Sequence, residues 1–247
     1  MNPVWQDVEL PRGFQLDYRE ATGSTNDDAR EAAAAGAAEG LVIVASRQDA
    51  GRGRRGAAWV CPPGEGLAFS VLLRPRENKA LWPRLSLAAG LAVAEALERL
   101  GVVAEVKWPN DVWVAGKKIA GILVEAGDDH VVVGVGINVG VREFPPALAE
   151  SATSLALERG DPPELPMVLL PVLERLQVWQ AKIGAGFDEL LRAFRVRCAL
   201  TGKAVRLLAA DGMLSGTVAG IGDGGELLLQ TGTGLRKLVQ ADEVRVV

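Results

Sequence analysis

The chain contains few of the side chains that build disulfides or metal centres. Only two of its 247 residues are cysteines, Cys61 and Cys198, far apart and outside any CxxC pair. Neither a disulfide framework nor a thiolate zinc site is therefore indicated. The single histidine, His130, excludes a histidine-rich metal centre and argues against a histidine-based triad. We predict no metal site made by protein side chains, and we expect His130 in a solvated turn.

Long apolar runs and a surplus of positive charge are also missing. No charge-free span is long enough to cross a membrane, and the opening MNPVWQDVEL lacks the basic and apolar regions of a signal peptide. We therefore expect a cytoplasmic protein with no membrane association. Lys and Arg number 27 against 31 Asp and Glu, a net charge of -4, whereas nucleic-acid binders are usually basic. Phosphate chemistry would have to come from a local cluster of cations.

The apolar pattern predicts an α+β fold with a mixed, largely antiparallel sheet and several helices. Apolar or alternating runs predict strands at residues 14–19, 41–45, 67–73, 102–108, 111–114, 119–125 and 131–139. Helices are predicted from a cap at Ser24 or Thr25 to a stop at Gly36, and at residues 80–100, 147–159, 165–183 and 187–199. Short turns separate the strands between residues 102 and 139, so we expect an antiparallel meander there.

The pattern changes after Leu200. Short strands at close spacing are predicted at residues 204–208, 212–221, 226–230, 234–239 and 242–246, which is typical of a small barrel. We place the boundary near Thr201, between a large domain of residues 1–200 and a small domain of residues 201–247.

The segment Gly51–Gly56 (GRGRRG) is the sharpest motif. It formally fits the dinucleotide fingerprint GxGxxG, but that fingerprint needs a helix starting within the glycines, and the following Pro62 and Pro63 forbid a continuous helix. Residues 220–225 fit the same expression, as a hairpin turn. What remains is a glycine-hinged loop with three arginines, suited to carboxylate or phosphate. A solvated basic loop or an RNA contact is the alternative.

A second cluster follows in KWPND (residues 107–111) and the nearby Lys117-Lys118. Two strands joined by a short turn would bring Lys107, Asp111 and Lys118 to one end of a sheet, and converging lysines suit a phosphate. Lysines kept wet in a turn are the alternative.

Three weaker signals complete the set. The strand GVGIN (residues 134–138) contains glycines, which suggests close approach by a ligand or backbone. It also contains a lone amide, Asn138, which would contact a ligand or, as the alternative, make a structural hydrogen bond. The triplet Ser24-Thr25-Asn26 could be a simple helix cap. Trp59, an aromatic in a polar loop, could stack on a base.

The chain resembles the biotin–protein ligases in a set of motifs that occur in the same order. These are STN, GRGRRG with the following Trp, KWPND with KKIAGILVE, and GVGIN. The resemblance runs from about Asp17 to Asn138 and continues weakly into the tail. It implies a class II synthetase-like catalytic domain that binds biotin and ATP, followed by an SH3-like β-barrel. Because STN begins at Ser24, we expect a form without an N-terminal DNA-binding domain and no role on DNA.

The resemblance implies ATP-dependent synthesis of biotinyl-5'-AMP, with Mg²⁺, and transfer of biotin to a lysine of the biotin carboxyl-carrier domain of a carboxylase. A homodimer through an exposed sheet edge stays open. The biotin site would comprise Ser24, Thr25, Asn26, Gln48, Gly51, Arg52, Gly53, Arg54, Lys118 and Gly121. The ATP site would comprise Arg52, Arg54, Arg55, Trp59, Lys107, Asn110, Lys118 and Asn138. The catalytic residues would be Lys118, Arg54, Asp111 and Lys107.

Lys118 is expected to clamp the two anions that meet in the first step, and Asp111 to orient the acceptor lysine rather than to act as a strong base. Three alternatives remain. A lipoate or octanoate ligase of related fold would have no use for the STN set. A non-enzymatic nucleic-acid binder would conflict with the acidic net charge. A stand-alone regulator would bind biotinyl-AMP without transferring it.

Overall fold

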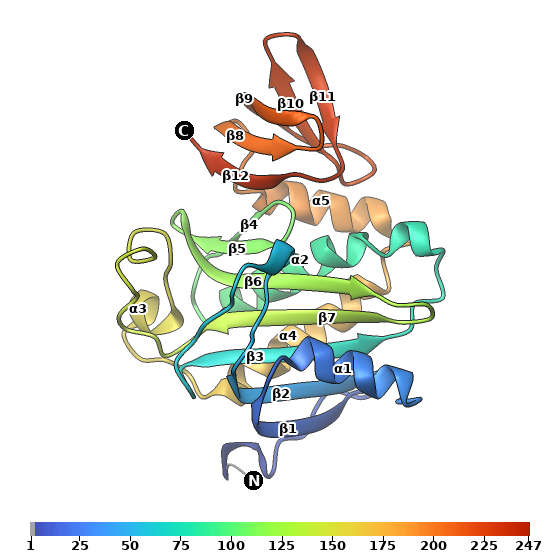
Figure 1. Cartoon of the computed structure of the whole chain (residues 1–247), viewed down its shortest axis with the longest axis vertical. Coiled ribbons are helices and arrows are strands. Elements are labelled where there is room, and N and C mark those ends of the chain that lie inside the picture. The colour runs from blue at the N-terminus through green and yellow to red at the C-terminus, as the bar shows by residue number, and fades with distance from the viewer. Residues whose placement is uncertain (1–2) are drawn as a thin grey trace.

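The computed structural model describes residues 3–247, which form a large mixed sheet and a smaller antiparallel sheet (Figure 1). The large sheet has the order β1-β2-β3-β7-β6-β5-β4. Its strands are β1 (Gln15–Thr22), β2 (Leu41–Gln48), β3 (Gly66–Leu73), β4 (Glu105–Lys107), β5 (Asp111–Val114), β6 (Lys117–Ala126) and β7 (Val131–Asn138). Only β1 and β2 pair in parallel; the other pairs are antiparallel. The meander predicted for residues 102–139 is confirmed.

Helices cover both faces of this sheet (Figure 1). On one face lies α1 (Thr25–Ala34), which connects β1 to β2 and buries Ala29 and Ala33 against Ile43, Leu72 and Val132. The other face holds the main core, where α2 (Arg84–Arg99) packs against α4 (Leu165–Gln180). Since side chains alternate along a strand, β2 directs Ile43 to α1 and its neighbours Val42 and Val44 to the main core.

The C-terminal sheet has the order β11-β10-β9-β8-β12, all antiparallel, as in an SH3-like domain. Its strands are β8 (Ala204–Ala209), β9 (Gly212–Ile221), β10 (Leu227–Thr231), β11 (Gly234–Leu238) and β12 (Asp242–Val246). Helix α5 (Phe187–Arg197) packs against both β4 and β9 and so joins the two sheets. The boundary near Thr201 stays a prediction.

Some predicted elements differ in extent from the observed ones. The helix at 147–159 shrinks to α3 (Leu155–Arg159), capped by Ser154, whose hydroxyl accepts from the amide of Leu157. Residues 151–153 cannot be helical because they pair with β6: the amide of Lys118 donates to the carbonyl of Ser151, and the amide of Thr153 donates to that of Lys118. The strand predicted at 102–108 is reduced to β4.

The helix predicted at 80–100 also divides. Residues Lys79–Leu81 form a 3₁₀ turn (η3), and α2 begins only after Pro83, which has no amide hydrogen for a continuing helix. Two further 3₁₀ turns are η1 (Pro3–Trp5) and η2 (Arg54–Gly56). Within residues 3–247, no helix is both long and apolar enough to cross a membrane.

Candidate active site

A cavity of about 580 Å³ opens between the main sheet, the loop after β2 and the start of β12. Most residues that the sequence marked for a site form its wall: Ser24, Thr25, Asn26, Gln48, Arg52, Gly53, Arg54, Arg55, Trp59, Lys107, Asn110, Asp111, Lys118 and Gly121. The arginine loop and the lysine hairpin, separated by some fifty residues of chain, therefore reach one cavity.

Glycines give this cavity a floor of bare backbone. Gly136 of β7 lies opposite Gly121 of β6, and Gly134 lies two residues away. A Cβ on Gly134 would lie under 3.0 Å from Oδ1 of Asn26, and one on Gly136 would lie equally close to the indole of Trp59. The close approach that glycine in a strand suggests is thus found here, and it is made by these two side chains.

One end of the cavity is lined by neutral polar groups. The amide and hydroxyl of Thr25 both donate to Oε1 of Gln48, at 2.8 and 3.0 Å. The hydroxyl of Ser70 lies 2.7 Å from Oγ1 of Thr25 and 2.6 Å from Oδ1 of Asn26. Nδ2 of Asn26 donates to Glu125 at 2.7 Å. The STN triplet is therefore more than a helix cap, and Ser24 makes no side-chain capping bond at all.

Sequence reasoning missed Ser70 and Glu125. Ser70 is fully buried, a lone hydroxyl within the apolar strand LAFSVLL. Glu125 is a charge at the end of the apolar run IAGILV. A polar group in such a setting needs a buried partner, so the signal was present in both strands.

The first arginine of the loop is held beside this polar end. Nη2 of Arg52 lies 2.6 Å from Asp27, and Nη1 lies 3.3 Å from Glu125. Its buried Nε has no hydrogen-bond partner within residues 3–247. A buried donor without a partner is costly, so Arg52 has one donor available for a ligand.

The other two arginines contact the start of β12 in the C-terminal sheet. Arg54 lies 3.3 Å from Asp242 of β12 and also donates to Asn110 and to the carbonyl of Ala241. Arg55 pairs with the same Asp242 and adopts the left-handed conformation, with φ of 53°. Asp242 is nearly buried. A carboxylate of the small sheet thus contributes to the wall beside two site cations.

Lys118 and Lys107 form the opposite side. Nζ of Lys118 lies 2.6 Å from Asp111 and 5.9 Å from the ring centroid of Trp59. The ammonium of Lys107 lies over Trp113, 4.6 Å from its ring centroid. The pKa of Lys107 is lowered from its ordinary value, mainly because the ammonium is buried.

The charges of Asp111 and of neighbouring cations also act on Lys107. Asp111 opposes the shift, while Lys118 and Arg245 lower the pKa further. An anion bound beside Lys107 would favour its charged form and raise that pKa again.

Two predicted site residues lie outside the cavity wall. The carbonyl of Gly51 accepts from the amide of Trp59, so Gly51 shapes the loop instead of facing the cavity. Nδ2 of the buried Asn138 donates to the carbonyl of Thr153. That bond is the structural role left open by the sequence, and an adenine contact for Asn138 has no support in this structure.

The loop also contains a free, partly buried thiol, Cys61. Burial, together with the charge of Glu65, raises the pKa of Cys61 to about 12. Since the thiolate is the reactive form, we expect Cys61 to react with a disulfide reagent at pH 8 at least tenfold more slowly in the folded protein than in denaturant. Reaction in Cys198→Ser protein, which isolates Cys61, measures this. Equal rates in the two conditions would contradict the prediction.

The described carboxylates around the cavity are engaged by cations. Within residues 3–247, no group of three or more His, Cys, Asp or Glu side chains could hold a metal ion. The carboxylates of Asp27, Asp111 and Asp242 are instead paired with arginine or lysine. The residues present therefore do not fit a resident metal.

Comparisons with known proteins agree with this geometry. The model of the biotin/lipoate A/B protein ligase family matches residues 20–141. The chain is 34% identical over 239 residues to the bifunctional ligase/repressor BirA of Bacillus subtilis, covering 93% of this chain and 74% of that protein. It is 37% identical to the biotin--[acetyl-CoA-carboxylase] ligase of Mycobacterium tuberculosis, covering 93% and 88%.

A solved structure extends the likeness to three dimensions. The biotin protein ligase from Aquifex aeolicus in complex with biotin and ATP superimposes with a TM-score of 0.86 at 34% identity, over 94% of this chain and 99% of that one. The α+β fold with a second antiparallel sheet is thereby confirmed. The chain belongs to the biotin/lipoate A/B protein ligase family.

Proposed function

We propose that this chain is an enzyme that joins biotin to AMP at the expense of ATP and then transfers the biotinyl group to a lysine of a biotin carboxyl-carrier domain. One observation carries the proposal: a single cavity has a neutral polar end at Asn26 and Gln48 and a cationic side at Arg52, Arg54 and Lys118. Biotin has the same polarity, with a neutral cyclic urea at one end and a carboxylate at the other.

The polar end suits a urea because it offers neutral donors and acceptors. A buried site built on such groups rejects ligands that leave them unpaired. Lipoate has no urea, so it would leave the set around Thr25 and Gln48 unsatisfied. This argues for biotin over lipoate or octanoate within the same family.

The cationic side suits the first chemical step. A carboxylate oxygen of biotin attacks the α-phosphorus of ATP; a new P–O bond forms and the bond to pyrophosphate breaks. The reactants repel each other as anions, so Arg52, Arg54 and Lys118 would offset charge on both. This is catalysis by positioning and electrostatics, with Lys118 as the clamp between the two groups.

Binding therefore requires the site to exchange partners. Lys118 would turn from Asp111, and Arg54 from Asp242, toward the phosphates. The Nε of Arg52 would gain the partner that it lacks. Mg²⁺ would arrive on the phosphates of ATP, and we assign it no step because no described cluster holds it.

In the second step the amine of the acceptor lysine attacks the acyl carbon, and AMP leaves. An ordinary lysine has a pKa of ~10.4, so exposing its neutral amine at pH 7 costs roughly 4–5 kcal/mol. Asp111 is half-buried in the cavity wall and already binds an ammonium, that of Lys118. We therefore assign it the orientation of the incoming lysine.

The remaining wall residues would hold the nucleotide. Trp59 offers an indole face above the glycine floor for the adenine ring. Lys107 and Arg55 supply positive charge for the phosphates, and Asn110 already binds Arg54. Closure of the loop that contains Trp59 would shield the mixed anhydride from water.

Three further proposals concern the acceptor, the assembly and the compartment. The acceptor would be the carrier domain of a biotin-dependent carboxylase. The edge strand β1 could pair two copies, which sedimentation would detect. Two unpaired cysteines, Cys61 and Cys198, fit a reducing compartment such as the cytoplasm.

The test is biotin-dependent exchange of labelled pyrophosphate into ATP, followed by addition of a carrier domain. We expect exchange with biotin, no exchange with lipoate, and labelling of the carrier lysine. Exchange with lipoate alone would assign the other branch of the family. Exchange without labelling would favour a regulator that binds biotinyl-AMP, and steeply salt-dependent RNA binding without exchange would favour a nucleic-acid role.

A further inference from the structure

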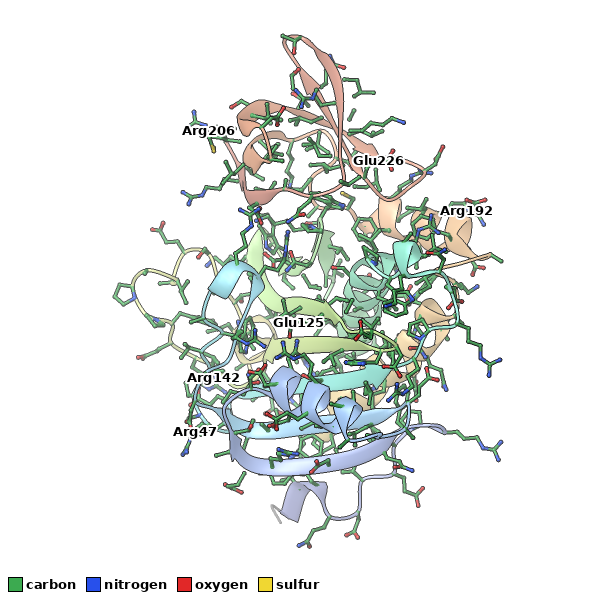
Figure 2. All side chains as sticks on the ribbon, turned by 45° about the vertical axis from the view of Figure 1, so that its right-hand side comes forward. Arg47, Glu125, Arg142, Arg192, Arg206 and Glu226 are labelled. Atoms are coloured by element: carbon green, nitrogen blue, oxygen red, sulfur yellow. The ribbon has the colours of Figure 1, made fainter. Side chains whose placement is uncertain are left out.

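Glu125 lies behind the cavity wall, near the end of β6 and beside α1 (Figure 2). Its carboxylate accepts from Nδ2 of Asn26 at 2.7 Å and lies 3.3 Å from Arg52 and 3.4 Å from Arg30. It is not among the residues that form the cavity wall. We infer that Glu125 is a positioning residue, which holds the side-chain amide of Asn26 so that the amide oxygen faces the ligand. Asn26 then selects a ligand with a urea N–H. This inference rests on the proposed function.

The orientation of Asn26 follows from the chemistry of its partners. The oxygen and nitrogen of an amide are nearly equal in size, so only hydrogen bonds decide which way it turns. An ionised carboxylate only accepts, so Glu125 requires the Asn26 nitrogen to face it. The second hydrogen of that nitrogen points to the carbonyl of Leu123, at 3.4 Å. Both donors of Asn26 are thus used inside the protein.

The oxygen of Asn26 is consequently the group that faces the other way. It accepts from Ser70 at 2.6 Å and retains a second lone pair. Asn26 itself forms part of the cavity wall. Toward a ligand, Asn26 therefore acts as an acceptor and not as a donor.

Gln48 has the opposite orientation for an equally firm reason. The backbone amide of Thr25 can only donate, and it donates to Oε1 of Gln48. The nitrogen of Gln48 is left as the donor available to the cavity. Asn26 and Gln48 together present one acceptor and one donor, the complement of a urea, in which N–H groups flank a carbonyl.

The same carboxylate also holds Arg52. Losing Glu125 would leave Arg52 with Asp27 as its remaining acidic partner among those described above. One residue thus ties the polar end of the cavity to its first cation. If Glu125 were purely structural, it would serve only to neutralise the exposed Arg30. Removing Arg30 would then have the same effect as removing Glu125.

The experiment measures binding of biotin and of biotins methylated at one urea nitrogen or the other, by titration calorimetry. Unmodified protein should bind biotin and reject at least one methylated form strongly. Glu125→Leu should raise the biotin Kd about tenfold to hundredfold, as expected for leaving buried donors unpaired, and should lower the discrimination against that methylated form. Arg30→Gln, which removes the exposed ion pairs of Arg30 with Glu125 and Asp27, should leave both quantities unchanged.

Coupling provides the second readout. In an Asn26→Ala background, Glu125→Leu should change the biotin Kd less than threefold, because its main target is already gone. Additive effects would overturn the inference, as would unchanged discrimination in Glu125→Leu, or an effect of Arg30→Gln as large as that of Glu125→Leu.

Two outcomes distinguish a failure of this inference from a failure of the proposed function and from a failure of the variant to fold. If the unmodified protein does not bind biotin, the proposed function fails instead. Should Glu125→Leu not fold, Glu125→Gln replaces it: glutamine can turn its own nitrogen toward Asn26, so discrimination should fall several-fold with little change in melting temperature. Unchanged discrimination in that variant would overturn the inference.

Discussion

Lys118→Ala is expected to lower the rate of biotinyl-AMP synthesis by about 10²–10³, with biotin still bound. Lys118 is the cavity lysine whose ammonium already pairs with a carboxylate, at 2.6 Å from Asp111. That ammonium would meet the charge that develops between the biotin carboxylate and the α-phosphate. Its loss removes an interaction made in the transition state, so the maximal rate falls more than biotin affinity. Pyrophosphate exchange and biotin titration measure the two quantities separately.

The chain offers a matched control in the neighbouring lysine. Lys117 begins β6 and is exposed, outside the cavity wall, so Lys117→Ala should leave the exchange rate near normal. Lys118 and Asp111 are both partly exposed, and such pairs contribute little to stability, so both variants should melt near the unmodified protein. Near-normal exchange in Lys118→Ala would remove Lys118 from the clamp.

Gly134→Ala is the second large effect that we expect, here on biotin affinity. The added Cβ would lie under 3.0 Å from Oδ1 of Asn26, and Asn26 cannot retreat because Ser70 and Glu125 hold it. The crowded amide would no longer offer its oxygen to the ligand, and an unpaired buried N–H costs about 1–3 kcal/mol, so the biotin Kd should rise about tenfold to hundredfold.

Gly136→Ala separates this effect from a general cost of alanine in β7. Its Cβ would meet the indole of Trp59 instead, which we assign to the nucleotide and not to biotin. We therefore expect Gly136→Ala to bind biotin within tenfold of normal and to lose affinity mainly for ATP. Equal loss of biotin affinity in both variants would mean that the glycines serve the sheet and not the ligand.

Local patterns predicted most of the framework. The strands 111–114, 212–221 and 242–246 have the bounds that their apolar alternation indicates. The helix at 147–159 failed because the partner of residues 151–153 is the distant Lys118, and no local pattern encodes such a pairing. Tertiary contacts overrode the local signal, as they commonly do.

For the site, the sequence indicated which residues gather but not how they pair. Arg52, Arg54 and Lys118 do line one cavity, as their motifs suggested. The carboxylate partners of the two arginines, Asp242 in particular, come from elements far away in sequence. Asn138 shows the converse: its motif indicated a ligand contact, while its neighbour in space, the carbonyl of Thr153, takes its side chain.

The pairing of cations described above also bears on how a nucleotide finds the cavity. Arg52 is held by Asp27 and Glu125, Arg54 and Arg55 by Asp242, and Lys118 by Asp111. Seen from several Debye lengths away, such pairs largely cancel and project little field into the solvent. Long-range steering therefore contributes little to the encounter, and recognition of the phosphates begins only at contact, when they compete with the carboxylates for the same guanidinium groups.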